Sequence, residues 1–353
     1  MTIIGINLGI KETQATFFDS TCIKPMVIAT INGYGTFSEE SVLETFLKLK
    51  KKTGDTEAVV AVNGCFNIGQ RQMIKDIGLR AGFRINRIIH KSSSIGLAYE
   101  FYRTHEERHK EKELLLCNIE KDYFEVAIAD VGQGVVEIQA IDWENNFNDI
   151  DTKCIEELFE KIISERERQL IEKSVAKGET TKDIKFTSEQ IDAVIITGDS
   201  SHLRQVVKKI FKKEPETNRN EEEFGIIGAG IQGAILSGHT KDVFLLDITS
   251  KSIGIEILNN NNMEIIIPHN TTIPTRKSKV FSVDMHRSTI VDINVFEGEK
   301  KTASQNQLIG KLSIPSISLG KSEIEVEMDI DVNSNIHITA KDSRSGKEYK
   351  SRI

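Results

Sequence analysis

The sequence predicts an α/β domain followed by an all-β domain. Up to Gly238, short β-rich runs alternate with segments that have the 3.6-residue period of amphipathic helices. From residue 243 to 350, apolar and polar residues alternate, turn signals recur, and no helical period persists. In residues 323–330, acidic residues alternate with Ile, Val and Met, which predicts a half-buried antiparallel strand. The second domain is therefore expected to be a β-sandwich.

The elements expected in the α/β part follow from its apolar periodicity and its turn residues. One amphipathic helix carries Val42, Phe46 and Leu49 on its apolar face and ends before Gly54. Further helices are expected at 70–82, 93–103, 152–176 and 200–213. Strands are expected at 2–8, 13–19, 58–62, 85–90, 114–118, 123–130, 134–141 and 192–198.

Composition limits the function classes. A chain of 353 residues, 39% of them hydrophobic, favours two or three domains. A net charge of −7 argues against a nucleic-acid-binding protein, which usually carries a basic stripe. Neither a signal peptide nor an apolar run of roughly 18 residues is found, so we expect a cytoplasmic protein without a membrane partner. The four cysteines form no C-x-x-C pair and are expected to be reduced thiols.

The segment HEERH, from His105 to His109, matches the H-E-x-x-H pattern of zinc proteases. In those enzymes two imidazoles lie on one face of a buried helix beside a catalytic cleft, with the glutamate as general base. Here residues 103–113 are almost all charged and have no apolar face. We therefore expect a solvated connection and no metal site.

The segment EFGIIGAGIQGAILSG, which ends at Gly238, has Gly228, Gly230 and Gly233 in the G-x-G-x-x-G spacing of a dinucleotide-binding turn. Such a turn needs a strand before the glycines and a full helix after them, and there is room for neither. Apolar residues recur instead at helical spacing straight through the glycines. The segment is predicted to be a helix that Asn220 caps and Gly238 ends, with the glycines permitting close packing of the helix.

Seven segments carry a pattern that can be compared with known families: IIGINLGI, CFNIGQRQMIKDIGLRAGF, VIITGDSSHLRQVVKKIFKKEP, GAGIQGAILSG, VFLLDITSKSIGIE, HNTTIPTRKSKVFS and DIDVNSNIHITAKDSRSGKE. In this order they resemble the seventy-kilodalton heat-shock chaperones, most strongly from 225 to 350. The resemblance implies a reduced, actin-like (ribonuclease H-like) two-lobed nucleotide-binding-type domain at 1–240 and an apolar interdomain linker at 241–249. It also implies a β-sandwich peptide-binding domain at 250–353, without the family's helical lid.

The resemblance locates a nucleotide site whose residues have changed. The first phosphate hairpin of the family, D-L-G-T-T, reads Asn7, Leu8, Gly9, Ile10 and Lys11 here. The second, D-L-G-G-G-T, reads Asn118, Ile119, Glu120, Lys121, Asp122 and Tyr123. The motif N-E-P-T reads His90, Lys91, Ser92 and Ser93, and the adenine-side G-G-x-T-R reads Gly198, Asp199, Ser200, Ser201 and His202.

These changes remove carboxylates and glycines that would approach a magnesium-bound triphosphate. Two of the new side chains, Glu120 and Asp122, are anionic. A unit charge about 4 Å from a phosphate is worth roughly 4 kcal/mol at an effective dielectric near 20. A whole micromolar site is worth only about 8 kcal/mol. We therefore expect a vestigial nucleotide site and no catalytic residues.

The resemblance also locates an interdomain linker and a peptide pocket. The linker is Val243, Phe244, Leu245, Leu246 and Asp247, and its apolar run is expected to dock on the first domain. The pocket positions are all apolar here: Ile255, Leu258, Phe281, Val283, Val291, Ile293, Ile324 and Val326. The same residues could equally form the core of the sandwich. Asp284 stands where the family has a residue that arches over the peptide.

The leading hypothesis is a heat-shock-70-like chaperone homologue that binds extended apolar polypeptide segments in its β-domain, with ATP binding and hydrolysis lost. It needs no cofactor, and its partners are unfolded or extended apolar polypeptides and, in addition, co-chaperones. One alternative is a functional ATP-dependent chaperone with a weak ATPase, which needs ATP and magnesium. Another is a scaffold that binds co-chaperones through its remnant lobes.

Overall fold

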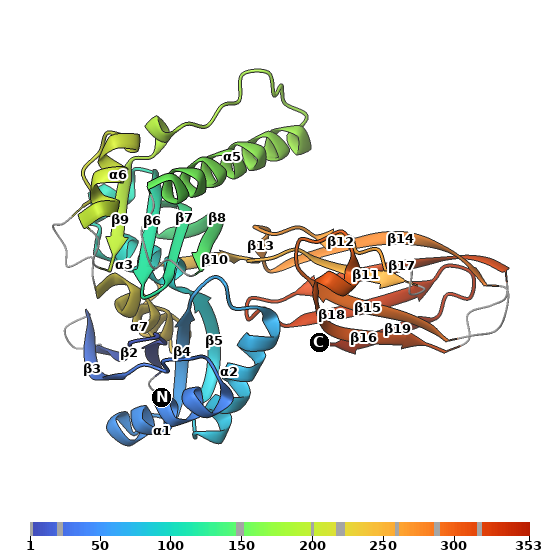
Figure 1. Cartoon of the computed structure of the whole chain (residues 1–353), viewed down its shortest axis with the longest axis horizontal. Helices are drawn as coiled ribbons and strands as arrows, with labels where there is room; N and C mark the ends of the chain where they lie inside the picture. Colours follow the sequence, from blue (N-terminus) through green and yellow to red (C-terminus); the bar gives the residue numbers. More distant parts are fainter. Residues whose placement is uncertain are drawn as a thin grey trace. The chain divides into compact units, whose positions relative to one another are not determined.

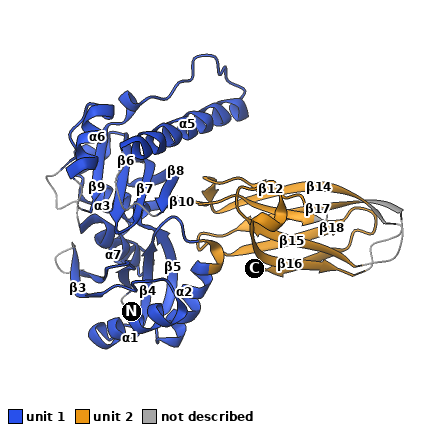
Figure 2. Cartoon of the chain, in the orientation of Figure 1, with its two compact units in different colours: residues 1–66, 70–247 blue, residues 67–69, 248–353 orange. Residues whose placement is uncertain are grey.

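A computed structural model describes residues 3–19, 24–145, 152–198, 201–216, 223–257, 261–285, 290–315 and 320–353. The chain divides into two compact units (Figure 2). Unit 1 comprises Met1–Phe66 and Gln70–Asp247, and unit 2 comprises Asn67–Gly69 and Ile248–Ile353. The main boundary falls inside the segment 241–249.

The first lobe of unit 1 is built on a sheet with the strand order β3-β2-β1-β4-β5. Strands β1, β2 and β3 are antiparallel, whereas β4 and β5 run parallel to β1. Two helices, α1 and α2, contribute apolar residues to the core of this lobe. The bounds are β1 Ile4–Asn7, β2 Glu12–Asp19, β3 Lys24–Asn32, α1 Glu39–Thr53, β4 Glu57–Val62, α2 Ile68–Arg80 and β5 Arg84–His90. Strand β3 was not among the elements expected from the sequence.

The second lobe contains strands in the order β10-β8-β7-β6-β9. Strands β6, β7 and β8 are antiparallel, while β9 pairs parallel with β6 and β10 pairs parallel with β8. Helices α5 and α6 supply apolar residues to the core of this lobe. The bounds are β6 Lys112–Glu120, β7 Tyr123–Gly132, β8 Val135–Asn145, α5 Thr152–Lys177, β9 Ala193–Thr197, α6 Ser201–Phe211 and β10 Phe244–Ile248.

Two helices, α3 (Lys91–Tyr102) and α7 (Phe224–Leu236), lie between the two sheets of unit 1 (Figure 1). The predicted helix through the glycine motif is confirmed, because α7 contains all three glycines. Gly238 has a φ of 76° and follows the end of α7, as expected of a helix terminator. Asn220 lies outside the described residues, and Glu223 occupies the N-cap position without a side-chain cap.

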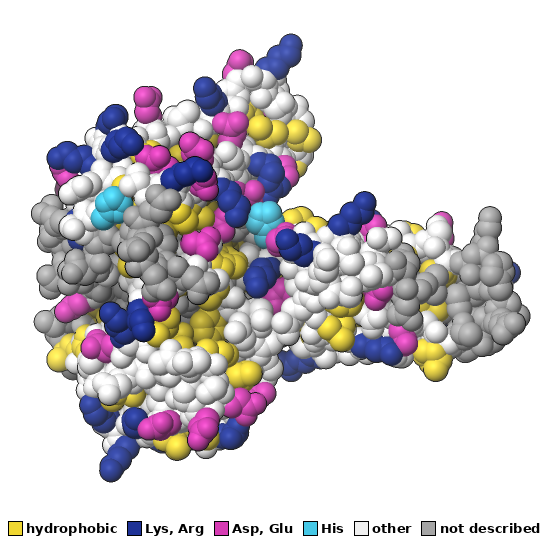
Figure 3. Space-filling model, in the orientation of Figure 1, with side chains coloured by type: hydrophobic (Ala, Val, Ile, Leu, Met, Phe, Trp, Pro, Cys, Tyr) yellow, Lys and Arg dark blue, Asp and Glu magenta, His cyan; other side chains and the backbone are white. Residues whose placement is uncertain are grey.

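The HEERH segment forms a single turn, α4 (His105–Arg108), which begins with a capping box at Thr104 and has no buried residue. Among the described residues, no three His, Cys, Asp or Glu side chains are grouped so that they could hold a metal ion. None of the helices in the described ranges is long and apolar enough to cross a membrane. On the face shown in Figure 3, acidic and basic side chains are interspersed.

Unit 2 is a sandwich of two sheets, as its alternating sequence predicts. Within the described residues the strand orders are β12-β11-β15-β16 and β14-β17-β18-β19. Apolar side chains from both sheets form one shared core. The bounds are β11 Ile253–Ile257, β12 Glu264–Ile267, β13 Thr272–Ile273, β14 Thr275–Met285, β15 Val291–Glu297, β16 Gln307–Ile314, β17 Gly320–Ile330, β18 Ile336–Asp342 and β19 Glu348–Arg352.

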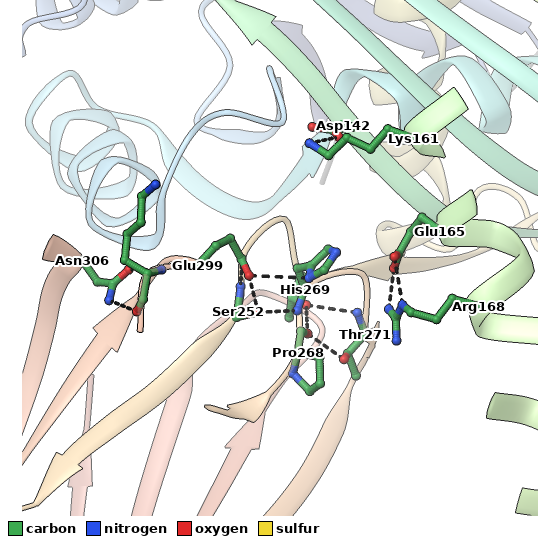
Figure 4. Close-up of polar contacts among 12 residues, drawn as sticks. Asp142, Lys161, Glu165, Arg168, Ser252, Pro268, His269, Thr271, Glu299 and Asn306 are labelled. Atoms are coloured by element: carbon green, nitrogen blue, oxygen red, sulfur yellow. Dashed lines mark hydrogen bonds and ion pairs between the residues drawn. The ribbon is translucent and has the colours of Figure 1, made fainter. Parts of the chain in front are cut away.

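A carboxylate fixes the residues that precede β11. The Glu299 carboxylate accepts hydrogen bonds from the backbone N–H of Ser252 at 2.7 Å and from its hydroxyl at 2.8 Å (Figure 4). The hydroxyl oxygen of Ser252 in turn accepts a hydrogen bond from the His269 N–H at 2.9 Å. These contacts tie three loops of unit 2 together at one end of the sandwich.

A buried arginine in the second lobe links α5 to the sheet. The Arg166 guanidinium binds Glu113 of β6 and both carboxylate oxygens of Asp130 of β7, the latter at 2.8 and 3.0 Å. These residues border a cavity of about 430 Å³ together with Asp192. Burial, and the hydrogen bond and charge of Asp130, raise the pKa of Glu113 to about 8, against the opposing effect of Arg166.

This shift makes the stability of the second lobe pH-dependent. Folded Glu113 binds its proton up to about pH 8, whereas the unfolded chain releases it near the ordinary value of 4.5. Since the folded state holds more protons across this window, stability falls as the pH rises, by up to about 1.4 kcal/mol per pH unit.

We therefore expect Glu113→Gln, which keeps an oxygen for Arg166, to be more stable than the wild type at pH 8, with the difference shrinking towards pH 6. Urea unfolding at pH 6, 7 and 8 measures this, with Trp143, the single tryptophan, reporting on the second lobe. Because other groups titrate alike in both proteins, their contribution cancels in the difference between the two free energies of unfolding. A difference that is constant across this range would show that Glu113 does not titrate there.

Candidate functional site

Three turns that the sequence assigns to a nucleotide site come together between the two lobes of unit 1. The turn after β1 meets the turn after β6, because the Ile10 N–H lies 3.5 Å from Oε2 of Glu120. The end of β9 joins them: the Thr197 hydroxyl donates to Oδ1 of Asn118 at 2.8 Å, and a Cβ at Gly198 would lie 2.2 Å from the Ile119 carbonyl oxygen. We call this region the cleft.

Glu120 stands where the family's second hairpin has a glycine, and its side chain points into the cleft, as the sequence comparison suggested. Its Oε1 forms an ion pair with the ammonium of Lys91, the first residue of α3. The Lys91 side chain is 1% exposed and that of Glu120 is 18% exposed. An ammonium buried at this depth without a partner would lose several kcal/mol of hydration free energy. The ion pair with Glu120 compensates the buried charge of Lys91.

A second carboxylate, Glu125, lies deeper in the cleft on β7 and is fully buried. Its Oε2 accepts the Gly64 N–H at 2.6 Å and the Tyr123 hydroxyl, and its Oε1 accepts the Ser92 N–H at 3.2 Å. Gly64 follows β4 in the first lobe, and Ser92 lies in the first turn of α3, where the helix dipole favours an anion. A carboxylate of the second lobe is thus bound by backbone donors from outside that lobe.

The two carboxylates also affect nearby phenols. Burial, followed by the charge of Glu120, raises the pKa of Tyr34 above its ordinary value. Burial, followed by the charge of Glu125, raises the pKa of Tyr123 well above its ordinary value. Both phenols are therefore neutral hydrogen-bonding groups near neutral pH.

The other predicted nucleotide-site residues differ in their surroundings. Neither Oδ1 of Asn7 nor Nδ2 of Asn118 has a hydrogen-bond partner among the described residues, although both atoms are buried. Gly9 lies in a tight turn, where a Cβ would be 2.2 Å from the Glu12 carbonyl oxygen. Lys11 is exposed, and His202 lies at the start of α6, where its Nε2 is 3.1 Å from Oγ1 of Thr152.

Asp122 has a partly exposed side chain that lies beside a lysine. It has a φ of 61° in the turn after β6, its side chain is 38% exposed, and its carboxylate lies 3.8 Å from the Lys121 ammonium. Asp199 lies outside the described residues.

Sequence reasoning did not identify Lys91 or Glu125 as members of this site. Lys91 was recognised only as the loss of a family glutamate, and its pairing with Glu120 depends on a contact between distant segments. For Glu125 the signal was available, because a lone carboxylate interrupts the apolar run of β7. A buried acid in a central strand requires donors, and these mark a polar site.

The predicted linker forms β10, which pairs with β8 at Val135, Val136 and Glu137. Val243 and Leu245 are 2% and 3% exposed, whereas Phe244 is 55% exposed, because successive side chains of a strand point to opposite faces. The apolar run is therefore only partly buried.

The carboxylate of Asp247 anchors the end of the linker inside unit 1. Its Oδ1 lies 2.8 Å from Nδ1 of His90 and accepts the Ser93 hydroxyl at 2.8 Å. Burial raises the pKa of Asp247, but His90, Arg87 and Arg71 together outweigh burial and hold it well below its usual range. Asp247 is therefore a buried anion that these three groups stabilise.

The described peptide-pocket positions lie in unit 2, in or against the core that both sheets share. Phe281 is only partly buried and packs at the margin of that core. Leu258 and the side chain of Asp284 lie outside the described residues. Six positions are almost fully buried: Ile255, Val283, Val291, Ile293, Ile324 and Val326.

One comparison with known proteins covers both units. A sequence model of the family described as Hsp70 protein matches residues 10–177 and 153–353. The match takes in the cleft, the linker strand β10 and the sandwich of unit 2. The chain belongs to the Hsp70 family.

Proposed function

We propose that this Hsp70 homologue binds extended apolar polypeptide segments in its β-sandwich unit and does so without an ATP cycle. The two-lobed unit 1, which we infer to be actin-like, acts in this proposal as a scaffold whose linker stays docked. The observation that carries the proposal is that backbone N–H groups facing the cleft are already bonded to the protein's own carboxylates.

The cleft chemistry does not suit a magnesium-bound triphosphate. The N–H groups of Gly64 and Ser92 bind Glu125, and Lys91 binds Glu120. A phosphate would have to displace a carboxylate from these donors while remaining close to its charge. Amides, which replace the metal-ordering carboxylate in both hairpins, are weaker ligands for a hard cation.

We expect millimolar MgATP to leave the melting temperature of the wild-type chain unchanged. A ligand present at 100 times its dissociation constant would stabilise the folded state by about 2.7 kcal/mol, which shifts melting by several degrees. Differential scanning fluorimetry with MgATP, MgADP and magnesium alone measures this. A nucleotide-specific shift of that size would favour the alternative of a working ATPase chaperone.

The anchoring of Asp247 supports a linker that stays docked without nucleotide. Asp247→Ala would leave the buried His90 and Ser93 without this acceptor, and leaving a buried donor unsatisfied costs roughly 1 to 3 kcal/mol. We expect chymotrypsin to cut the variant after Phe244 or Leu245 at least about tenfold faster than the wild type.

The exposed Asp242, two residues before β10, provides the control. Asp242→Ala should be cleaved at the wild-type rate, and MgATP should change none of the three rates. Rapid cleavage of the wild-type linker would contradict permanent docking.

Peptide binding by unit 2 needs a site at its surface, and the structure narrows where to test for one. Val291 is fully buried in the shared core, so a larger residue there would overpack the sandwich and confuse folding with binding. Phe281 is better placed, because it is only partly buried. Its neighbour on β14, Val280, is 54% exposed and points to the other face.

We expect a labelled leucine-rich heptapeptide to bind the wild type with micromolar affinity, since burying one leucine gives roughly 1.5 to 3 kcal/mol before ordering costs. Phe281→Ser should weaken binding by at least about tenfold, and Val280→Ser should leave it nearly unchanged. Fluorescence anisotropy measures binding, and thermal melting verifies that both variants fold. Absence of binding by the wild type up to millimolar protein would replace this proposal with a scaffold for co-chaperones.

A further inference from the structure

The contacts of Glu125 resemble those of a bound anion more than those of an ordinary core residue. Its two carboxylate oxygens accept N–H groups from Gly64, after β4, and from Ser92, in the first turn of α3. A Cβ at Gly64 would lie 3.0 Å from Oε2 of Glu125 and 2.6 Å from Cδ1 of Ile141. A glycine therefore allows the backbone to approach this carboxylate closely, as glycines do at phosphate sites.

Glu120 makes a second bridge across the cleft, and its side chain is more exposed than that of Glu125. It joins the turn after β6 in the second lobe to Lys91, at the junction of β5 and α3, and its Oε2 lies 3.5 Å from the Ile10 N–H of the first lobe. Lys91 supplies a buried positive charge where a bound anion would need a counter-charge. Both bridges begin in the second lobe and end on segments outside it.

We propose that Glu120 and Glu125 act as an internal anionic ligand that holds the two lobes of unit 1 together in place of a bound ligand, with Lys91 as the counter-cation of Glu120. The lobes are then held together by the chain itself at all times. This inference does not depend on peptide binding by unit 2, and its tests do not involve that unit.

The first test uses the wild-type protein and its amide hydrogen exchange. The Gly64 and Ser92 amides should be protected as strongly as amides of the neighbouring strands, at least about 100-fold over exposed loops. In Glu125→Gln the side-chain NH2 would face one of these two N–H donors, and that backbone amide should exchange at least about tenfold faster while β4 and β7 stay protected. Unprotected amides in the wild type, or unchanged exchange in a folded variant, would overturn the proposal.

The second test asks whether an added anion can take the place of the internal one. Glu120→Gly frees the Lys91 ammonium and the Ile10 N–H, so millimolar pyrophosphate should raise the melting temperature of this variant by several degrees and leave the wild type unchanged. The double variant Lys91→Met/Glu120→Gly is the matched control and should not respond. An equal response in the wild type, or the absence of a response in a folded Glu120→Gly protein, would contradict the proposal.

Discussion

The close packing of α7 against its neighbours is the constraint on which unit 1 depends. A Cβ at Gly228 would lie 1.8 Å from the carbonyl oxygen of Ser94 in α3, and one at Gly230 would lie 2.5 Å from Oγ1 of Thr16 in β2. A Cβ at Gly233 would lie 2.4 Å from the Ile3 carbonyl oxygen. Side chains at these positions would push α3 away from the first lobe. Because α3 begins at Lys91, this packing also sets where the cation and the backbone donors of the cleft lie.

Buried polar side chains in the cleft must therefore find their hydrogen-bond and ion-pair partners within the protein itself. Glu125 is fully buried and Lys91 nearly so, and polar groups at that depth need hydrogen bonds or an opposite charge nearby. The protein meets this requirement with backbone N–H groups and an ion pair. In our proposal these donors serve the internal charges and are not left for a phosphate.

In unit 2 the sequence does not distinguish a peptide groove from the sandwich core. A residue at the base of a peptide groove and a residue of the sandwich core are both apolar and lie on the same face of a strand. Sequence could therefore locate Ile255, Val291 and Ile293 on the inner face, but it could not separate the two roles. Among the pocket positions that the structure describes, burial separates only Phe281 from the others, because its side chain lies at the margin of the core. Binding measurements on variants of Phe281 therefore decide whether unit 2 has a peptide groove at this position.

The sequence by itself determined the order and type of most elements, the all-β character of unit 2 and the helical nature of the glycine motif. Local periodicity and turn residues carry this information. Strand β3, at the edge of its sheet, has only a weak apolar pattern and was therefore not predicted. The chain's resemblance to the family also indicated which two turns correspond to the family's phosphate hairpins and which glycines are replaced there. Only the tertiary structure decided that Lys91 meets Glu120, that Gly64 and Ser92 bind Glu125, and that Asp122 stays partly exposed beside Lys121. The first two of these pairings join residues from different lobes, and the place of a charged side chain depends on the partners that folding brings to it.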